Sequence, residues 1–162
     1  MPSSEFKNDA HHLHKSLRML CSANEHLGHA CAENQDLYLT DFRALLLIRE
    51  AQEEGRSLTA GELATSLSLS SGAVTYLVER LSQSGHVSRD VDPQDRRKVL
   101  LQPTTLGIQV ANNYYVPLHQ TLSQVLQDLS PEDVATALSV LDRVNSAVQA
   151  HTVGVRAGGA SS

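Results

Sequence analysis

Apolar residues recur at helical spacing over much of the chain. Near the N-terminus they predict a long helix over residues 9–32, and its leucine stripe consists of Leu13, Leu17, Leu20 and Leu27. A second helix is predicted from Thr40, as its N-cap, to Gly55, which ends it. Its apolar face consists of Phe42, Leu45, Leu46 and Ile48. Each helix therefore has one face that should pack against a core.

Two shorter helices are predicted in the middle of the chain. Thr59 and Glu62 have the spacing of a capping box, so the first of them begins after Thr59 and ends near Leu67. Ser70 is the expected N-cap of the second, and Gly85 stops it. Its core-facing residues are Val74, Leu77, Val78 and Leu81. Two helices joined by so short a connection predict a helix-turn-helix.

From residue 86 the pattern changes to that of strands. Residues 86–91 and 98–102 read as two strands on either side of the turn-forming sequence Asp92-Pro93-Gln94-Asp95. A β-hairpin is therefore predicted directly after the helix-turn-helix.

The C-terminal part returns to helical spacing. A long helix is predicted from Thr104, and Pro117 inside it predicts a kink because proline removes a helix hydrogen bond. The last helix begins with Ser130 as its cap and Pro131 in its first turn. Its apolar stripe consists of Val134, Leu138, Leu141, Val144 and Val148. The predicted fold class is mainly α with a small β-hairpin wing, a winged helix-turn-helix flanked by long N- and C-terminal helices.

The charges are unevenly distributed along the chain. The net charge is −5, yet residues 70–102 hold five bases and four acids, and Arg96-Arg97-Lys98 is the only run of three bases. The acidic balance elsewhere indicates a solvated surface with low general affinity for nucleic acid. No apolar run approaches the ~18 residues of a membrane helix. The N-terminus lacks the pattern of a signal peptide, so we expect a cytoplasmic protein without a membrane partner.

The second short helix and the hairpin tip carry the candidate chemistry. The outer face of the helix holds small and hydrogen-bonding residues: Ser71, Gly72, Thr75, Tyr76, Glu79 and Gln83. Such groups suit contact with phosphate oxygens, base edges or a thymine methyl, although an ordinary solvated helix has the same composition. The tip places Arg96 and Arg97 on a projecting turn, and wing arginines of this kind enter the minor groove. Asp95 is expected to orient a guanidinium by a two-pronged pair.

The residues in these motifs closely resemble those of the MarR family. The matching stretches are LTDF at 39–42, LTAGELA at 58–64, SSGAVT at 70–75, DPQDRRKV at 92–99 and TTLG at 104–107, with Leu81, Gly85, Val87 and Arg89 between them. The resemblance covers residues 39–107 by motif and the remainder by helix order. Its most specific part is the wing, in which an acidic residue and proline precede Asp95-Arg96-Arg97.

The resemblance implies a homodimer whose first and last helices interlock and whose two recognition helices bind a palindromic operator in double-stranded DNA. The predicted DNA-binding residues are Ser70, Ser71, Thr75, Tyr76, Arg80, Asp95, Arg96, Arg97 and Lys98. Among them, Arg97 is expected to enter the minor groove with support from Asp95 and Arg96. The sequence departs from the family at Tyr76, where a basic residue is usual, and at Pro103, where leucine is usual.

Five segments are expected along the chain as a result. They are a flexible tail over 1–8, a helical dimerisation region over 9–38, the winged helix-turn-helix over 39–103, C-terminal dimerisation helices over 104–151 and a flexible tail over 152–162.

The family further implies a transcriptional regulator, generally a repressor, that a small-molecule effector releases from DNA. The residues leave alternatives open: an antirepressor that binds protein instead of DNA, a redox regulator using Cys21, or a metal-responsive one using His26, His29 and Cys31. We predict instead that Cys21 is a small buried residue, that the histidines are surface or interface residues, and that no metal or cofactor binds. No nucleophile–base pair or glycine-rich phosphate loop is present, so an enzyme is not expected.

Overall fold

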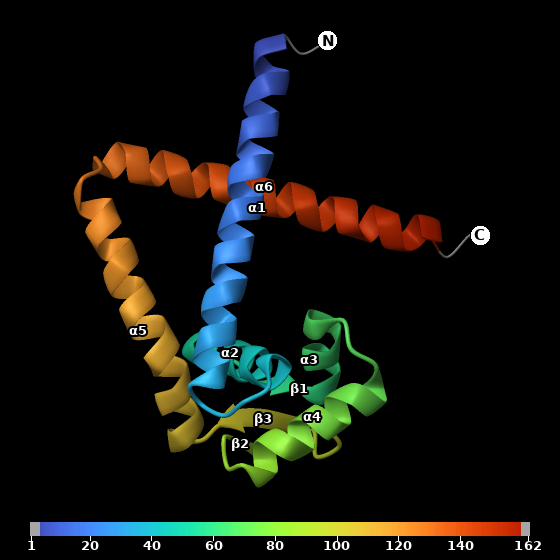
Figure 1. Cartoon of the computed structure of the whole chain (residues 1–162). Coiled ribbons are helices and arrows are strands. Elements are labelled where there is room, and N and C mark those ends of the chain that lie inside the picture. Colours follow the sequence, from blue (N-terminus) through green and yellow to red (C-terminus); the bar gives the residue numbers. More distant parts are fainter. Residues whose placement is uncertain (1–3, 160–162) are drawn as a thin grey trace. The chain divides into compact units, whose positions relative to one another are not determined.

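The structure is a computed structural model that describes residues 4–159 (Figure 1). The chain divides into two compact units, of which the first ends at Val116 and the second begins at Pro117. The elements are α1 (Ser4–Glu33), α2 (Leu39–Glu53), β1 (Leu58–Thr59), α3 (Ala60–Leu67), α4 (Ser71–Gln83), β2 (Val87–Val91), β3 (Val99–Pro103), α5 (Thr105–Gln127) and α6 (Pro131–Gly159). This order confirms the predicted winged helix-turn-helix with long flanking helices.

The sheet has three antiparallel strands in the order β1-β3-β2. The hairpin pairs Val87 with Pro103 and Val91 with Val99, within one residue of the predicted limits. The edge strand β1 was not predicted. It pairs Leu58 with Leu101, and two residues are too few to show the alternation by which a strand is recognised in a sequence.

Local side-chain caps define the helix-turn-helix. The Thr59 N–H donates to Glu62 Oε2 at 2.7 Å and the Glu62 N–H donates to Thr59 Oγ1 at 3.3 Å, which completes the predicted capping box. Ser70 Oγ accepts the Ala73 N–H at 3.3 Å and begins α4 as predicted. The expectation of Thr40 as a cap was wrong: α2 begins one residue earlier, and its N-cap Tyr38 makes no side-chain cap bond.

The core of the first unit lies between α2, the helix-turn-helix and the sheet. Its largest fully buried side chains are Phe42, Leu45, Ile48, Leu63, Leu81 and Leu101. The four residues predicted to face inward from α4 are at most 3% exposed. Burial of this apolar face fixes which side of α4 remains in solvent.

The wing and α5 meet at a close backbone contact. The Thr104 N–H donates to the His86 carbonyl at 3.0 Å, and Thr104 Oγ1 donates to the Gly85 carbonyl at 2.6 Å. Pro103, which departs from the family pattern, lies buried at the end of β3 opposite Val87. Gly107 packs directly on the same turn, because a Cβ built on it would lie 2.2 Å from the His86 carbonyl oxygen. This contact holds the start of α5 against the turn that joins α4 to β2.

His86 makes the stability of this junction depend on pH. Its side chain is buried and its Nδ1 lies 2.8 Å from Ser84 Oγ, and burial lowers its pKa below 6.5. Folding therefore favours the neutral ring, so its stabilisation is complete above pH 6.5 and is lost as the pH falls through the lowered pKa. We expect chemical denaturation of His86→Gln to show a smaller loss of stability below pH 6.5 than the native chain shows. The exposed control His26→Gln should follow the native curve, and an unchanged slope in His86→Gln would contradict the assignment.

Both outer helices exceed their predicted limits. Helix α1 begins at Ser4 instead of near Asp9, and α6 continues to Gly159, beyond the predicted limit at residue 151. Residues 4–8 and 152–159, predicted as parts of flexible tails, are therefore helical, and the remainder of those tails lies outside the described residues. Polar composition suggested a tail at the N-terminal end, but no proline or glycine interrupts a helix there.

The second unit consists of the end of α5 and all of α6. Pro117 lies inside α5, as predicted, and it is also where the two units divide. Ser130 caps α6, because its Oγ accepts the Asp133 N–H at 3.1 Å. No helix in the described part of the chain is long and apolar enough to cross a membrane.

Candidate nucleic-acid interface

Helix α4 presents a polar outer face beside the wing. Figure 1 shows α4 next to the β2–β3 hairpin in the first unit. Ser70, Ser71, Thr75 and Tyr76 are all exposed, opposite the buried apolar residues. Thr75 Oγ1 donates to the Ser71 carbonyl at 2.7 Å, so its hydroxyl hydrogen is already used within the helix. Thr75 can therefore meet a ligand only through its methyl group or as an acceptor.

Arg80 has a different environment from the one predicted. Its guanidinium binds both carboxylate oxygens of Asp41, with Nε 2.9 Å from Oδ2. The Asp41 side chain is only 4% exposed, and hydrogen bonding to it raises the pKa of Arg80. Arg80 was predicted to contact DNA, but the structure gives it a partner within the chain, 39 positions away. The pair joins α4 to the first turn of α2.

Two tyrosine rings enclose the same guanidinium. The Arg80 Cζ atom lies 4.7 Å from the ring centre of Tyr38 and 4.7 Å from that of Tyr76. Stacking of this kind is favourable because the ring face is electron-rich. Tyr76 is 63% exposed, yet one face of its ring rests on a cation that Asp41 holds in place. The sequence alone identified neither Tyr38 nor Asp41 as part of the site.

The other charge on α4 is also paired. Glu79 Oε2 accepts a hydrogen bond from Arg89 of β2 at 2.8 Å, and Glu79 Oε1 accepts one from Gln83 at 3.0 Å. The outer face of α4 therefore offers neutral groups, and its ion pairs tie the helix to its neighbours.

The wing tip is organised by aspartate side chains that bind its backbone. Asp92 Oδ1 accepts the Gln94 N–H at 2.8 Å, and Asp95 Oδ1 accepts the Arg97 N–H at 3.1 Å. The expectation that Asp95 orients a guanidinium is not met, because its carboxylate is turned to the backbone two residues on. Among the described residues no ion pair involves Arg96, Arg97 or Lys98. The tip thus carries three exposed cations that form no ion pair in the described part of the chain, although the pKa of Glu62, lowered mainly by hydrogen bonds from Thr59, is lowered further by the charge of Lys98.

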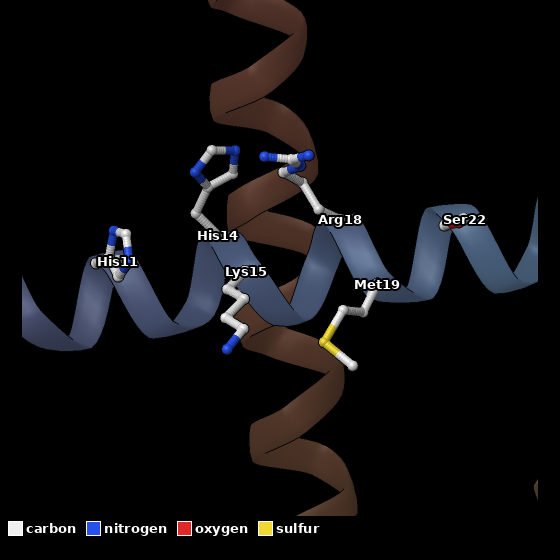
Figure 2. A pocket seen from close by; sticks show the side chains of 6 residues that line it. All are labelled: His11, His14, Lys15, Arg18, Met19 and Ser22. Carbon is white, nitrogen blue, oxygen red and sulfur yellow. The ribbon is translucent and has the colours of Figure 1, made fainter.

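A hollow of about 540 Å³ along α1 is a second candidate, but its residues do not converge. Figure 2 shows His14 and Arg18 on one side of the helix and Lys15 and Met19 on the other. All its lining residues come from this one helix and all are exposed. A small-molecule site requires groups that surround its ligand, so we assign no ligand to this hollow. The outer face of α4 and the wing lie on neighbouring elements, and we favour them as the site.

The cysteines and histidines of α1 do not form a site in the described part of the chain. Cys21 is exposed, which contradicts its predicted burial. Cys31 is partly buried, and burial raises the pKa of its thiol, which disfavours the reactive thiolate. His26 and His29 are exposed. No group of three or more histidine, cysteine, aspartate or glutamate side chains there is arranged to hold a metal.

Comparison with known proteins identifies the family. A profile described as the MarR family matches residues 37–99. The HTH-type transcriptional regulator YcgE of Bacillus subtilis is 32% identical over 114 residues, which are 70% of this chain and 71% of YcgE. The chain belongs to the MarR family.

Solved structures agree with this membership. The reduced form of MarR from E. coli has a TM-score of 0.57 and 30% identity, with 82% of this chain and 95% of that one covered. The S. aureus MepR–DNA complex has a TM-score of 0.61 and covers 82% of this chain and 93% of its own, but at 20% identity it supports the fold alone. As a member of the MarR family the protein is a DNA-binding transcriptional regulator with a winged helix-turn-helix.

Proposed function

We propose that the protein represses transcription as a homodimer that binds a palindromic operator, with α4 in the major groove and the wing in the minor groove. The observation that carries this proposal is the combination, in one unit, of a neutral hydrogen-bonding helix face with a wing tip that carries three exposed cations outside any ion pair of the described residues. An operator with two-fold symmetry would place its half-sites about one helical turn apart.

The wing supplies the phosphate attraction in this proposal. The chain as a whole is acidic and both charges of α4 are paired within the molecule. Arg96, Arg97 and Lys98 are thus the cations available near α4 to neutralise phosphates. Binding should weaken with salt, although the dependence should be shallow for a DNA-binding protein.

Arg97→Ala tests the wing directly. Removal of an arginine from the minor groove should weaken operator binding about 10- to 100-fold and leave the dimer intact. Fluorescence anisotropy at one fixed salt concentration measures this loss. Arg56→Ala is the matched control, because Arg56 is an exposed arginine outside the wing tip and is paired with Glu54. Equal affinities for Arg97→Ala and the native protein would exclude the wing from the interface.

Exposed apolar side chains support the homodimer. On α1 they include Met19 and Leu20, which are 65% and 62% exposed. Those of α6 are Leu138, Val140, Leu141, Val148, Val153 and Val155. A single chain leaves these residues in water, and a second copy would bury them.

The double variant Leu138→Glu/Leu141→Glu should therefore be monomeric. In a two-fold interface each new carboxylate would lie close to the same carboxylate of the second subunit, and the like charges would repel. Because a monomer binds only one half-site, operator affinity should fall at least about 100-fold. Sedimentation velocity gives the oligomeric state. Thr136→Glu places the same charge on the other side of α6 and should leave the dimer intact, whereas a dimeric double variant would refute the interface.

The proposal includes an effector whose binding releases the protein from its operator. It also places the protein in the cytoplasm, with the DNA, and assigns it no catalytic activity. The cavity lined by Cys31, Phe42 and Tyr114 has a volume of about 70 Å³. Ligand pockets usually have about 300 Å³ or more. Effector binding at that position would thus require the helices to move apart.

A further inference from the structure

Helix α4 carries an open hollow at the point where it would meet base pairs. It is shallow and is lined by residues of α4 alone, so it is a dip in an exposed helix face that could meet a DNA groove. The lining residues are Ser71, Gly72, Thr75, Tyr76 and Glu79. Gly72 faces open space, since a Cβ built there would have no atom of the chain within 4 Å. A glycine with this much space is not required by packing within the chain. Its absence of a side chain instead lets another molecule approach the helix backbone.

One wall of the hollow is held in place. The exposed Tyr76 ring rests on the Arg80 guanidinium, which also stacks on Tyr38 and is fixed by the buried Asp41. An exposed tyrosine normally samples several rotamers, and this stack restricts it before any ligand binds. Tyr38 and Arg80 are therefore positioning residues for Tyr76.

The lining of the hollow selects a particular ligand group. The Thr75 methyl, the Tyr76 ring and the Gly72 Cα give it a mainly apolar surface, because the Thr75 hydroxyl hydrogen is used within the helix, and the Ser71 hydroxyl is a polar group beside them. The Glu79 carboxylate lies at one end and would repel a phosphate. In the major groove the apolar group that a base pair presents is the 5-methyl group of thymine.

We propose that this hollow recognises one thymine in each operator half-site through its 5-methyl group. The inference rests on the proposed function and extends it from DNA binding to the base that α4 reads.

The test begins with an operator selected by the native protein from a random-sequence pool. Each thymine is then replaced by uracil, which removes only the methyl group. At one position per half-site the affinity should fall about fourfold, the value of one buried methyl group, and about 15-fold when both half-sites are changed. Specific binding with no uracil-sensitive position would overturn the inference and leave the proposed function standing. Binding with no sequence preference would overturn both.

Variants locate the methyl group in the hollow. Gly72→Ala adds a methyl group to the lining of the hollow without a clash inside the chain, so the protein should fold normally. The thymine-to-uracil affinity ratio should fall to about one. Tyr38→Ala should lower the same ratio through the loosened Tyr76 ring. Gly61→Ala is the matched control, an exposed helical glycine on α3, and should keep the full ratio. A full ratio in Gly72→Ala would show that the methyl group is read elsewhere.

Discussion

Gly107→Ala should destabilise the protein by about 3 kcal/mol, an effect at the upper end of those seen when a packed core receives an extra methyl group. The new Cβ would lie 2.2 Å from the His86 carbonyl oxygen and 3.0 Å from Leu45 Cδ1. The leucine can change its rotamer, but the carbonyl is fixed because it accepts the Thr104 N–H. The backbone of α5 must therefore move away from the wing.

The loss of stability expected for Gly107→Ala is informative because helix propensity alone would predict a gain. Alanine is favoured over glycine inside a helix by about 1 kcal/mol. The exposed Gly61 of α3 has no backbone atom of another element nearby, so Gly61→Ala should be neutral or stabilising by up to that amount. Urea denaturation of both variants measures the contrast. A Gly107→Ala protein as stable as Gly61→Ala would mean that α5 does not pack on the start of the wing as described.

Arg80→Met should also cost about 3 kcal/mol, because it leaves the Asp41 carboxylate buried without its counter-charge. The Asp41 side chain is 4% exposed and that of Arg80 is 29% exposed. Asp41→Asn should therefore be milder, at about 1–2 kcal/mol, since the arginine that remains can reach water. Equal losses for the two single variants would contradict this asymmetry.

The double variant Asp41→Leu/Arg80→Met separates charge from structure. Replacement of a buried ion pair by apolar residues of similar volume is often neutral, so this protein should recover most of the stability that Arg80→Met loses. It should still lack the cation that holds the Tyr76 ring, and its DNA affinity should remain reduced. Urea denaturation and operator titration on the same preparations measure both quantities. Restored stability together with fully restored DNA binding would show that the Arg80 stack has no part in recognition.

The helix-turn-helix could be predicted from the sequence because its signals are local. Thr59 and Glu62 are three residues apart, Ser70 caps the helix that follows it, and Gly85 adopts the positive φ of +77° at the stop. Caps and turns of this kind are decided by neighbours along the chain, so they can be identified without knowledge of the tertiary fold.

The features that escaped prediction depend on distant partners. The edge strand β1 exists because Leu58 meets Leu101, and Arg80 pairs with Asp41 across 39 positions. A single sequence does not show which acidic residue will approach which arginine. The same limit applies to Arg80, which was predicted as a DNA-binding residue and whose pairing with Asp41 the sequence did not show.

Cys21 illustrates a third limit, which concerns assembly. The absence of a local sequence typical of a reactive cysteine favoured burial, but the described chain leaves Cys21 exposed together with Met19 and Leu20. Apolar periodicity shows that a face should be covered, and it does not show whether the cover comes from the same chain or from a second copy. The candidate interface was partly predictable. The wing cations are consecutive in the sequence and could be identified there, whereas the stack behind Tyr76 depends on residues distant in the sequence and could not.

The most direct test of the central claim is the binding of the purified protein to the DNA that flanks its own gene, followed by fluorescence anisotropy at two salt concentrations. The account predicts saturable binding that prefers this DNA over a shuffled sequence of the same composition, weakens as salt increases and weakens further in Arg97→Ala. Equal affinity for the flanking DNA, for an operator selected from a random pool and for shuffled DNA would contradict sequence-specific recognition by α4 and the wing.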